Sequence, residues 1–342
     1  MSALPDLFTL DRSVFRTRAD WARHRLCLLD CVVGPQYGGL PLTPQRTVWD
    51  VDTPHASPMP GRVRCTGVVS SQDPDYAFRL TLWLPDGMIR PPVVLTGDGL
   101  GGAVADAVTA LALSMGVALA HFDRQDLAPD HPVPDRDTHL YASAKGSFGA
   151  LAAWAWGYHR CVDVLEAAGL VDSKRMAVVG HSRGGKASLL AGATDTRIRL
   201  TGANGSGAGG AGCYRALGPG AESLEDLLQR FPYWFGPGMA AYADQVQTLP
   251  FDQHFLKAAV APRWLYTTEA LDDHWANPDG TWLTHIAALQ VFHRLRYVDR
   301  AGVHFRKGGH AHTHIDWLAL LTRLVSLPDD VPLQPQQDVL PG

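Results

Sequence analysis

A short glycine-rich turn constrains the fold of this chain more than any other feature of its 342 residues. Residues 176–179 are four consecutive apolar residues that predict a buried strand, and the pattern Gly180-x-Ser182-x-Gly184 follows, ahead of an alanine- and leucine-rich helix. In such a turn the serine is strained, and the glycines omit side chains that would collide across it. The hydroxyl then lies at the carboxyl edge of a sheet, near the positive end of a helix. Ser182 is therefore the candidate nucleophile; the alternative is a glycine-rich turn whose serine has no chemical role.

Strands and helices alternate along the chain from about residue 90. The predicted strands are Val93–Thr96, Val117–Phe122, Met176–Val179, Arg199–Ala203, Trp264–Thr267 and Val303–Arg306. The predicted helices begin at Ala103, at Phe148 (ending at Ala168), after Ser182, at Trp282 and at Thr313. Such alternation indicates βαβ units, and a Gly-x-Ser-x-Gly turn within them is typical of α/β-hydrolases. We therefore expect an α/β-hydrolase fold, with a mostly parallel central sheet and helices on both faces in a three-layer αβα sandwich.

The chain is expected to form a single α/β-hydrolase domain over residues 1–326. Outside the alternating region lie an N-terminal helical extension (1–45), antiparallel strands (46–86) and a surface tail (327–342). An insertion between two of the later strands (207–251) is expected to cover one end of the sheet. In the extension, apolar residues at helical spacing predict a helix over Trp21–Val32 that ends at the Gly34-Pro35 pair.

Charge and composition exclude several functions. The chain has 34 acidic and 30 basic residues, a net charge of −4, and lacks the basic stripe that nucleic-acid binding needs. Its five cysteines are odd in number and scattered, which argues against a disulfide framework and a thiolate zinc site. No stretch approaches the ~18 apolar residues of a membrane span, and no secretory signal is visible. We therefore expect a cytoplasmic protein without nucleic-acid or membrane partners; the sequence does not indicate its oligomeric state.

A serine nucleophile needs a base, because its hydroxyl is a poor nucleophile at neutral pH. In this fold the chain order is serine, acid, histidine, and His310 follows the last predicted strand and a Gly308-Gly309 turn. The tract His310-x-His312-x-His314 also allows a metal site, but that site would need an extended strand, whereas these residues lie at a helix entrance. We predict that His310 is the base and that the histidine tract holds no metal.

The acid of the triad should follow the preceding strand, in a loop that contains three carboxylates. Asp273 is the preferred candidate, and Asp272 and Glu269 are the alternatives. The task of this acid is to hold the tautomer of the imidazole and to stabilise the imidazolium.

A second glycine-rich loop, residues 97–102, follows an early strand. It lacks the spacing of a phosphate-binding loop. The loop at this place in α/β-hydrolases supplies a backbone N–H to the oxyanion hole, and we assign that role to Gly99 or Leu100.

Several motifs together resemble one family. They are residues 153–157 (AWAWG), 180–186 (GHSRGGK), 191–199 (AGATDTRIR), 206–210 (SGAGG), 230–235 (RFPYWF), 249–254 (LPFDQH), 261–263 (APR) and 308–310 (GGH). This set is similar to the glucuronoyl esterases (carbohydrate esterase family 15) and their bacterial relatives, from about residue 145 to 320. The resemblance implies cleavage of esters between 4-O-methyl-glucuronic acid on xylan and an alcohol, without a cofactor.

The resemblance also implies roles for individual residues. Ser182 would be the nucleophile and His310 the base, and Arg183 resembles the family arginine whose side chain contributes to the oxyanion hole. The residues that the resemblance places at the sugar are Lys186, Glu222, Trp234 and Trp275. Alternatively, Arg183 and Lys186 lie on the surface of the helix and Trp275 serves packing only.

The chain departs from the family in two places. Many members carry the acid at the position of Gly205, which has no side chain; other bacterial members use an acid after the later strand, where Asp273 lies. Fungal members have a disulfide beside the site, at positions that are His181 and Ala311 here, which is consistent with a reducing compartment.

The leading hypothesis is a serine carboxylesterase of the glucuronoyl esterase type, acting on a small-molecule or carbohydrate ester through an acyl-enzyme. A second hypothesis keeps the triad and changes the substrate to an acetyl-sugar, a dienelactone or a small xenobiotic ester. A third is a catalytically silent binding protein on a hydrolase scaffold, for which Gly205 is the only support.

Overall fold

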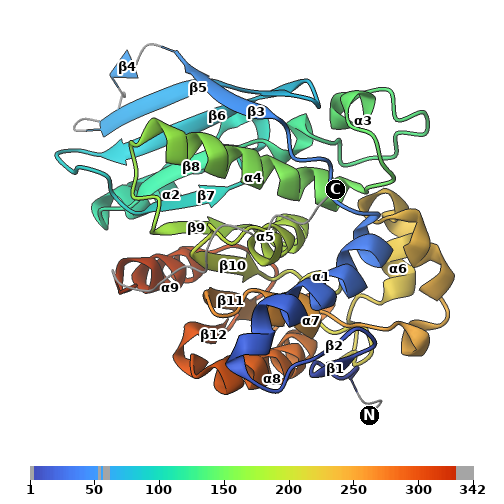
Figure 1. The fold of residues 1–342 in the computed structure, drawn as a ribbon. Helices are drawn as coiled ribbons and strands as arrows, with labels where there is room; N and C mark the ends of the chain where they lie inside the picture. Colours follow the sequence, from blue (N-terminus) through green and yellow to red (C-terminus); the bar gives the residue numbers. More distant parts are fainter. Residues whose placement is uncertain (1–3, 53–54, 57–61, 329–342) are drawn as a thin grey trace.

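A ten-stranded sheet forms the centre of the computed structural model, which describes residues 4–52, 55–56 and 62–328 (Figure 1). Its strands are β3 (Arg46–Val51), β4 (His55–Ala56), β5 (Arg62–Gln72), β6 (Tyr76–Pro85), β7 (Val93–Thr96), β8 (Ala118–Phe122), β9 (Met176–Val179), β10 (Leu200–Asn204), β11 (Trp264–Ala270) and β12 (Ala301–Arg306). Their order is β12-β11-β10-β9-β7-β8-β6-β5-β3, with β4 beside β5. The six strands from β12 to β8 are parallel, whereas β3 to β6 pair antiparallel. The predicted mostly parallel sheet is confirmed.

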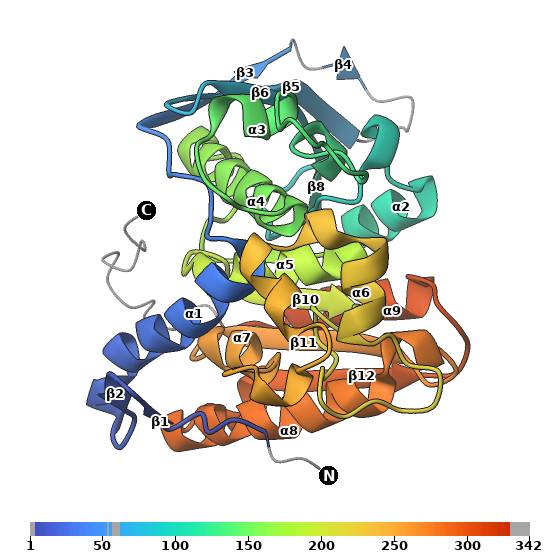
Figure 2. The ribbon, with the colours of Figure 1, turned by 90° about the vertical axis from the view of Figure 1, so that its right-hand side faces the viewer.

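Helices cover both faces of this sheet. They are α1 (Trp21–Tyr37), α2 (Asp106–Ser114), α3 (His139–Ser143), α4 (Ala150–Ala168), α5 (Arg183–Thr194), α6 (Leu224–Arg230), α7 (His254–Ala259), α8 (Pro278–Leu295) and α9 (His314–Val325). One apolar core joins the sheet to α1, α4, α5, α7 and α8, and a second joins its other face to α2 and α9 (Figure 2). The strands β7 to β10 are buried along their whole length, as expected for parallel strands with helices on both sides.

The first long helix differs from its prediction. It continues through Gly34-Pro35 to Tyr37, although Pro35 has no N–H to give to the helix. Contacts outside the helix hold its last turn, because the N–H groups of Gly236 and Gly149 donate to the carbonyls of Gln36 and Tyr37, both at 2.9 Å. The predicted end at Gly34-Pro35 is therefore wrong: the helix ends at Tyr37, and Gly38, in the left-handed conformation, caps it.

Helix α1 also reaches two distant parts of the chain. Trp21 Nε1 donates to the carbonyl of Ala261 at 3.0 Å, and Arg25 Nε donates to the carbonyl of Ala259 at 2.7 Å. Both carbonyls lie at or just after the end of α7, and the two donor side chains are buried. The N-terminal hairpin of β1 (Thr9–Leu10) and β2 (Ser13–Val14) lies beside this helix (Figure 1).

Helices α4 and α9 begin within two residues of their predicted starts, at Ala150 and His314, whereas α8 and α2 begin three or more residues away. Helix α8 starts at Pro278 rather than at Trp282, because Asn277 caps it by accepting the N–H of Gly280 at 3.0 Å. Helix α2 starts at Asp106 rather than at Ala103, after two glycines with positive φ.

The insertion over 207–251 contains α6 and three short 3₁₀ helices, and α6 lies in front of α5 and β10 in Figure 2. Of the predicted tail, Leu327 packs in the second core, and residues 329–342 lie outside the described residues.

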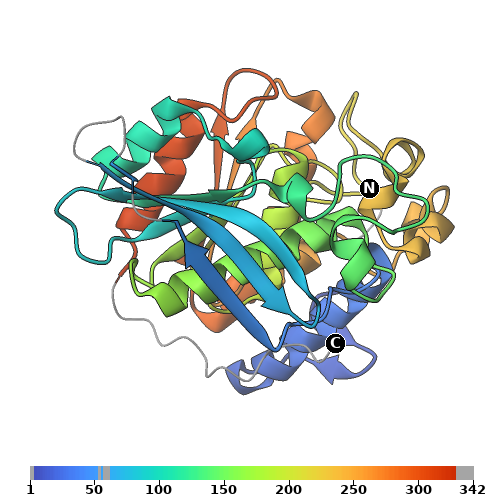
Figure 3. The ribbon, with the colours of Figure 1, turned by 90° about the horizontal axis from the view of Figure 1, so that it is seen from above.

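Figure 3 shows the antiparallel strands at one side of the molecule, with α4 behind them. None of the helices in the described part of the chain has the length and hydrophobicity needed to cross a membrane.

Candidate active site

Ser182 lies in a strained turn between β9 and α5. Its φ of 55° and ψ of −122° place a non-glycine residue at positive φ, a conformation that costs about 1–3 kcal/mol. The surrounding chain holds it, because the Ser182 N–H donates to the carbonyl of Asn204 at 2.8 Å. A side chain at Gly180 would overlap the carbonyl of Gly184, so the first glycine of the motif is required by the turn itself.

Asp98 supports this turn from the side. Its Oδ2 accepts the N–H of His181 at 2.7 Å, and its Oδ1 forms an ion pair with Arg124, whose side chain is buried. A side chain at Gly184 would overlap the Asp98 carboxylate, so the second glycine of the motif makes room for Asp98. Asp98 had no role in the sequence analysis, although it is an acidic residue inside the glycine-rich loop 97–102.

The two backbone candidates for the oxyanion hole differ. The N–H of Gly99 donates to the carbonyl of Phe122 at 3.1 Å and is therefore occupied. Leu100 is the first residue of a short 3₁₀ helix, and its side chain is exposed. α/β-hydrolases use one backbone N–H from this loop and the N–H of the residue after the serine. In this chain the candidate donors are therefore the N–H groups of Leu100 and Arg183.

His310 and Asp273 are hydrogen-bonded. The distance from His310 Nδ1 to Asp273 Oδ2 is 2.6 Å, the aspartate is buried, and the histidine side chain is 40% exposed. The bond directs the other ring nitrogen, Nε2, away from the carboxylate. A Cβ at Gly205 would lie 3.4 Å from Asp273 Oδ2 and 3.6 Å from His310 Nδ1, so this glycine borders the pair.

The other two carboxylates of the loop have different partners. Asp272 is exposed and accepts the N–H of Gly308 at 2.8 Å, which ties the loop after β11 to the turn after β12. Glu269 is fully buried, and burial raises its pKa to about 8. It accepts a hydrogen bond from the hydroxyl of Thr281 at 3.1 Å. The geometry therefore separates Asp273 from both alternatives.

The three histidines of the tract have different surroundings. His310 faces Asp273, while His312 stacks on Trp317 with the ring centroids 4.4 Å apart, and burial lowers its pKa to about 3. His314 is exposed as the first residue of α9. Within the described residues, no group of three His, Cys, Asp or Glu side chains is placed to hold a metal ion.

His181 lies against the proposed base, where the sequence analysis assigned no role. Its ring centroid is 4.5 Å from that of His310, and its Nδ1 is 2.6 Å from Oδ1 of Asn204. The amide oxygen only accepts hydrogen bonds, so His181 Nδ1 carries the proton, and burial lowers the pKa of this ring.

Lys186, Glu222 and Trp275 form one connected group. Lys186 Nζ donates to Glu222 Oε2 at 3.0 Å and to the carbonyl of Ala208, while Trp275 Nε1 donates to Glu222 Oε1 at 3.1 Å. The lysine and glutamate side chains are only 3% and 5% exposed. Trp275 is 39% exposed, so its ring is the accessible member of the group. The structure therefore brings together three of the four predicted sugar-binding residues.

The fourth, Trp234, lies with Arg183. The guanidinium carbon of Arg183 is 5.0 Å from the centroid of the Trp234 ring, and Lys186 Nζ is 5.6 Å from the same ring. Arg183 also forms an ion pair with Asp130. Asp130 lies in the loop after β8 and is not among the residues predicted from the sequence.

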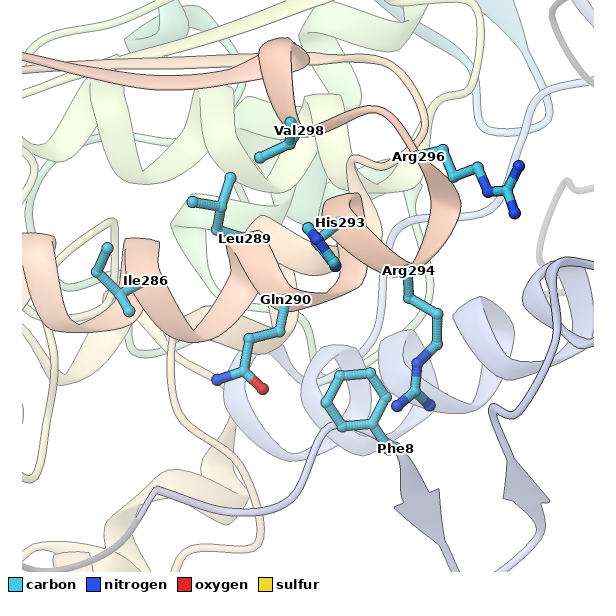
Figure 4. Close-up of a pocket in the computed structure, with 8 residues that line it drawn as sticks. All are labelled: Phe8, Ile286, Leu289, Gln290, His293, Arg294, Arg296 and Val298. Atoms are coloured by element: carbon cyan, nitrogen blue, oxygen red, sulfur yellow. The ribbon is translucent and has the colours of Figure 1, made fainter.

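An open cavity of about 970 Å³ lies elsewhere (Figure 4). It is lined by Phe8 and by residues of α8 and the turn after it, such as Ile286 and Arg294. None of the predicted site residues lines it, so this cavity is separate from the candidate active site.

Comparisons with known proteins agree with the resemblance seen in the motifs. A family model described as glucuronyl esterase, fungi, matches residues 68–296. The 4-O-methyl-glucuronoyl methylesterase 1 of Phanerochaete chrysosporium is 31% identical over 323 residues, which are 91% of this chain and 66% of that protein. Carbohydrate esterase MZ0003, from an unknown prokaryotic organism, is 35% identical over 228 residues, 60% of this chain and 52% of that protein. The chain thus spans about half to two thirds of the length of these relatives.

Solved structures show the same fold. A carbohydrate esterase family 15 glucuronoyl esterase from Caldicellulosiruptor kristjansonii superposes with a TM-score of 0.80 at 29% identity, covering 94% of this chain and 89% of that one. The expected α/β-hydrolase fold is confirmed. From the family model and the length of the similarity, the chain belongs to the glucuronyl esterase family.

Proposed function

We propose that this protein is a serine carboxylesterase that hydrolyses esters of 4-O-methyl-glucuronic acid. The observation that carries the proposal is the 2.6 Å hydrogen bond between His310 and Asp273. The His310 ring lies 4.5 Å from that of His181, which directly precedes Ser182 in the strained turn. Family membership supports the substrate, because relatives named 4-O-methyl-glucuronoyl methylesterases match most of the chain.

In the proposed reaction, Ser182 Oγ attacks the ester carbonyl and His310 accepts its proton through Nε2. The imidazolium then gives this proton to the departing alcohol, and an acyl-enzyme remains. Water, activated by the same histidine, releases the acid. Asp273 stays ionised throughout, holds the ring and stabilises the imidazolium. The backbone N–H groups of Leu100 and Arg183 stabilise the oxyanion, together with the guanidinium N–H groups of Arg183 that Asp130 does not engage.

The sugar would lie against the group formed by Lys186, Glu222 and Trp275. Lys186 Nζ has three donors, and two of them are used by Glu222 and the Ala208 carbonyl, so one remains for a ring hydroxyl. The half-exposed Trp275 ring offers an apolar face, and its bond to Glu222 fixes its orientation.

Two measurements test the activity. Methyl and benzyl glucuronate esters should be cleaved in preference to acetyl and p-nitrophenyl esters. A fluorophosphonate should label the wild-type protein and not Ser182→Ala, which separates an enzyme from a silent binding protein. If the protein is labelled but prefers acetyl esters, the assignment of the triad stands and the proposed glucuronate substrate is wrong.

Replacing Lys186 by alanine tests the sugar contact. A hydrogen bond from a charged donor is worth roughly 1.5–3 kcal/mol, so kcat/KM for a glucuronate ester should fall about tenfold to 150-fold. For p-nitrophenyl acetate, which has no sugar hydroxyls, kcat/KM should remain nearly unchanged. Because both substrates are measured on the same variant, the ratio of the losses corrects for damage to the fold. Equal losses would mean that Lys186 only supports the structure.

A further inference from the structure

The two cations next to the proposed nucleophile are each paired with a carboxylate. Arg183 follows Ser182 directly and forms an ion pair with Asp130. Lys186, one helical turn further along α5, forms an ion pair with Glu222 at 3.0 Å. The first turn of this helix therefore presents two positive side chains whose charges are already balanced.

Asp130 is held in place by the insertion that contains α6. Its Oδ1 accepts the indole N–H of Trp234 at 2.9 Å and lies 3.1 Å from the hydroxyl of Tyr233, while its Oδ2 pairs with Arg183. The side chain is only 12% exposed, against 34% for Arg183. A carboxylate with three donors from two separate segments cannot turn away to release the arginine without losing the other two bonds.

The four charges also form one cluster. The Trp234 ring lies within cation–π distance of both Arg183 and Lys186, so both cations lie next to the same ring. The two ion pairs together have no net charge. Asp273 beside His310 adds one carboxylate, and Arg230, whose guanidinium carbon is 5.0 Å from the centroid of the Trp275 ring, adds one guanidinium. The charges around the proposed site therefore sum to zero.

This balance of charges affects the substrate and the product of the proposed reaction differently. The ester group is uncharged, whereas the released uronic acid is an anion at neutral pH. An anionic carboxylate in this place would meet two cations whose charges Asp130 and Glu222 already neutralise, so it would gain less attraction than from an unpaired guanidinium or ammonium group. We propose that Asp130 and Glu222 are specificity-determining residues, which make the site select the neutral ester and bind the uronate product weakly. This inference rests on the proposed function.

The test compares two ligands that differ mainly in charge, glucuronate and its neutral amide, glucuronamide. Binding of each is measured by titration calorimetry at neutral pH and as competitive inhibition of ester hydrolysis. The wild-type protein should bind glucuronamide at least about tenfold more tightly, the lower end of what a hydrogen bond to a charged group contributes. Wild-type protein that binds glucuronate as tightly as the amide, or more tightly, would overturn the inference without any variant.

Asp130→Asn removes only the negative charge, because asparagine keeps the shape of the side chain and an oxygen that can accept the indole N–H of Trp234. Glucuronate should bind this variant about tenfold more tightly than it binds wild type, while affinity for glucuronamide stays within about twofold. Asp52→Asn is the control, since Asp52 is exposed and pairs with Arg79 near the edge strand β3; it should change neither affinity. A folded Asp130→Asn protein that shows no gain for glucuronate contradicts the inference.

The two proposals fail in different ways. If the protein cleaves no glucuronate ester and binds neither sugar, the proposed function is wrong and the inference falls with it. If it cleaves the ester but shows no preference for the neutral amide, the function stands and the charge argument is wrong.

Discussion

Replacing Glu222 by glutamine should destabilise the fold, because it leaves the ammonium group of Lys186 buried without a counter-charge. Both side chains are at most 5% exposed and lie 3.0 Å apart, and removing one partner of such a buried pair costs about 3–5 kcal/mol. With an unfolding entropy of about 2.1 cal/mol/K per residue, the 342 residues convert this loss into a Tm lower by roughly 4–7 °C. Glutamine keeps an oxygen that can accept the indole N–H of Trp275, so the decrease in Tm measures the effect of removing the negative charge.

The loss should depend on pH in a defined direction. Burial lowers the pKa of Lys186 and the charge of Glu222 opposes that effect, so the folded-state pKa is lower still in Glu222→Gln. Below that pKa both the folded and the unfolded states hold the proton, and the full cost applies. Above it only the unfolded state holds the proton, so stability rises with pH. The deficit relative to wild type should therefore shrink as the pH rises from neutral toward the ordinary lysine pKa of about 10.4.

Differential scanning calorimetry at several pH values measures both effects. Glu225→Gln, in which an exposed glutamate of α6 is changed, is the matched control and should shift Tm by less than about 1 °C, as for surface substitutions in general. Combining Glu222→Gln with Lys186→Met removes both charges and should recover most of the loss. A drop below about 1 °C, or a double variant no more stable than Glu222→Gln alone, would refute the idea that the pair is a buried and mutually dependent unit.

Three further outcomes are expected. Asp273→Asn should lower turnover by orders of magnitude, about 10⁴-fold where a triad loses control of its histidine tautomer, whereas Asp272→Asn should do much less; steady-state kinetics with the reverse order would reassign the acid. Ester hydrolysis should persist in EDTA and should not rise with added zinc, since no step uses metal-bound water; loss on chelation that a divalent ion restores would make the histidines of 310–314 candidate ligands. Gly180→Ala should destabilise the protein by more than about 2 kcal/mol in denaturant titration, because its Cβ would overlap the carbonyl of Gly184; unchanged stability would mean that the turn is adaptable.

Much of the fold could be predicted because its core strands carry a local signal. β7 and β9 are short runs of apolar residues buried on both faces, and their hydrophobicity is visible without knowledge of the rest of the chain. The end of α1 could not be predicted in this way. A Gly-Pro pair disfavours a helix locally, but the last turn is held by Gly149 and Gly236, which are more than a hundred residues away along the chain.

The candidate site likewise contains residues that have a local sequence signal and residues that have none. Ser182 is recognisable because the strain of its turn requires glycines at fixed spacing. The loop after β11 could be identified from chain order, but its hydrogen bonds were needed to distinguish Asp273 from Asp272. Asp130 had no local signal, since its donors Arg183 and Tyr233 lie 53 and 103 residues further along the chain.

The long-range bonds of α1 have a consequence for how the protein is made. Trp21 and Arg25 leave the ribosome early. Arg25 binds the carbonyl of Ala193, 168 positions later, and the carbonyls of Ala259 and Ala261 that complete the binding place lie 234 to 240 positions later. At about 5–20 residues per second, the first helix exists for roughly 10 to 50 seconds before its binding place has been synthesised. During that time its apolar face, with Leu28 and Val32, has no core to enter. We therefore expect this apolar face to stay exposed on the nascent chain until α7 has been made.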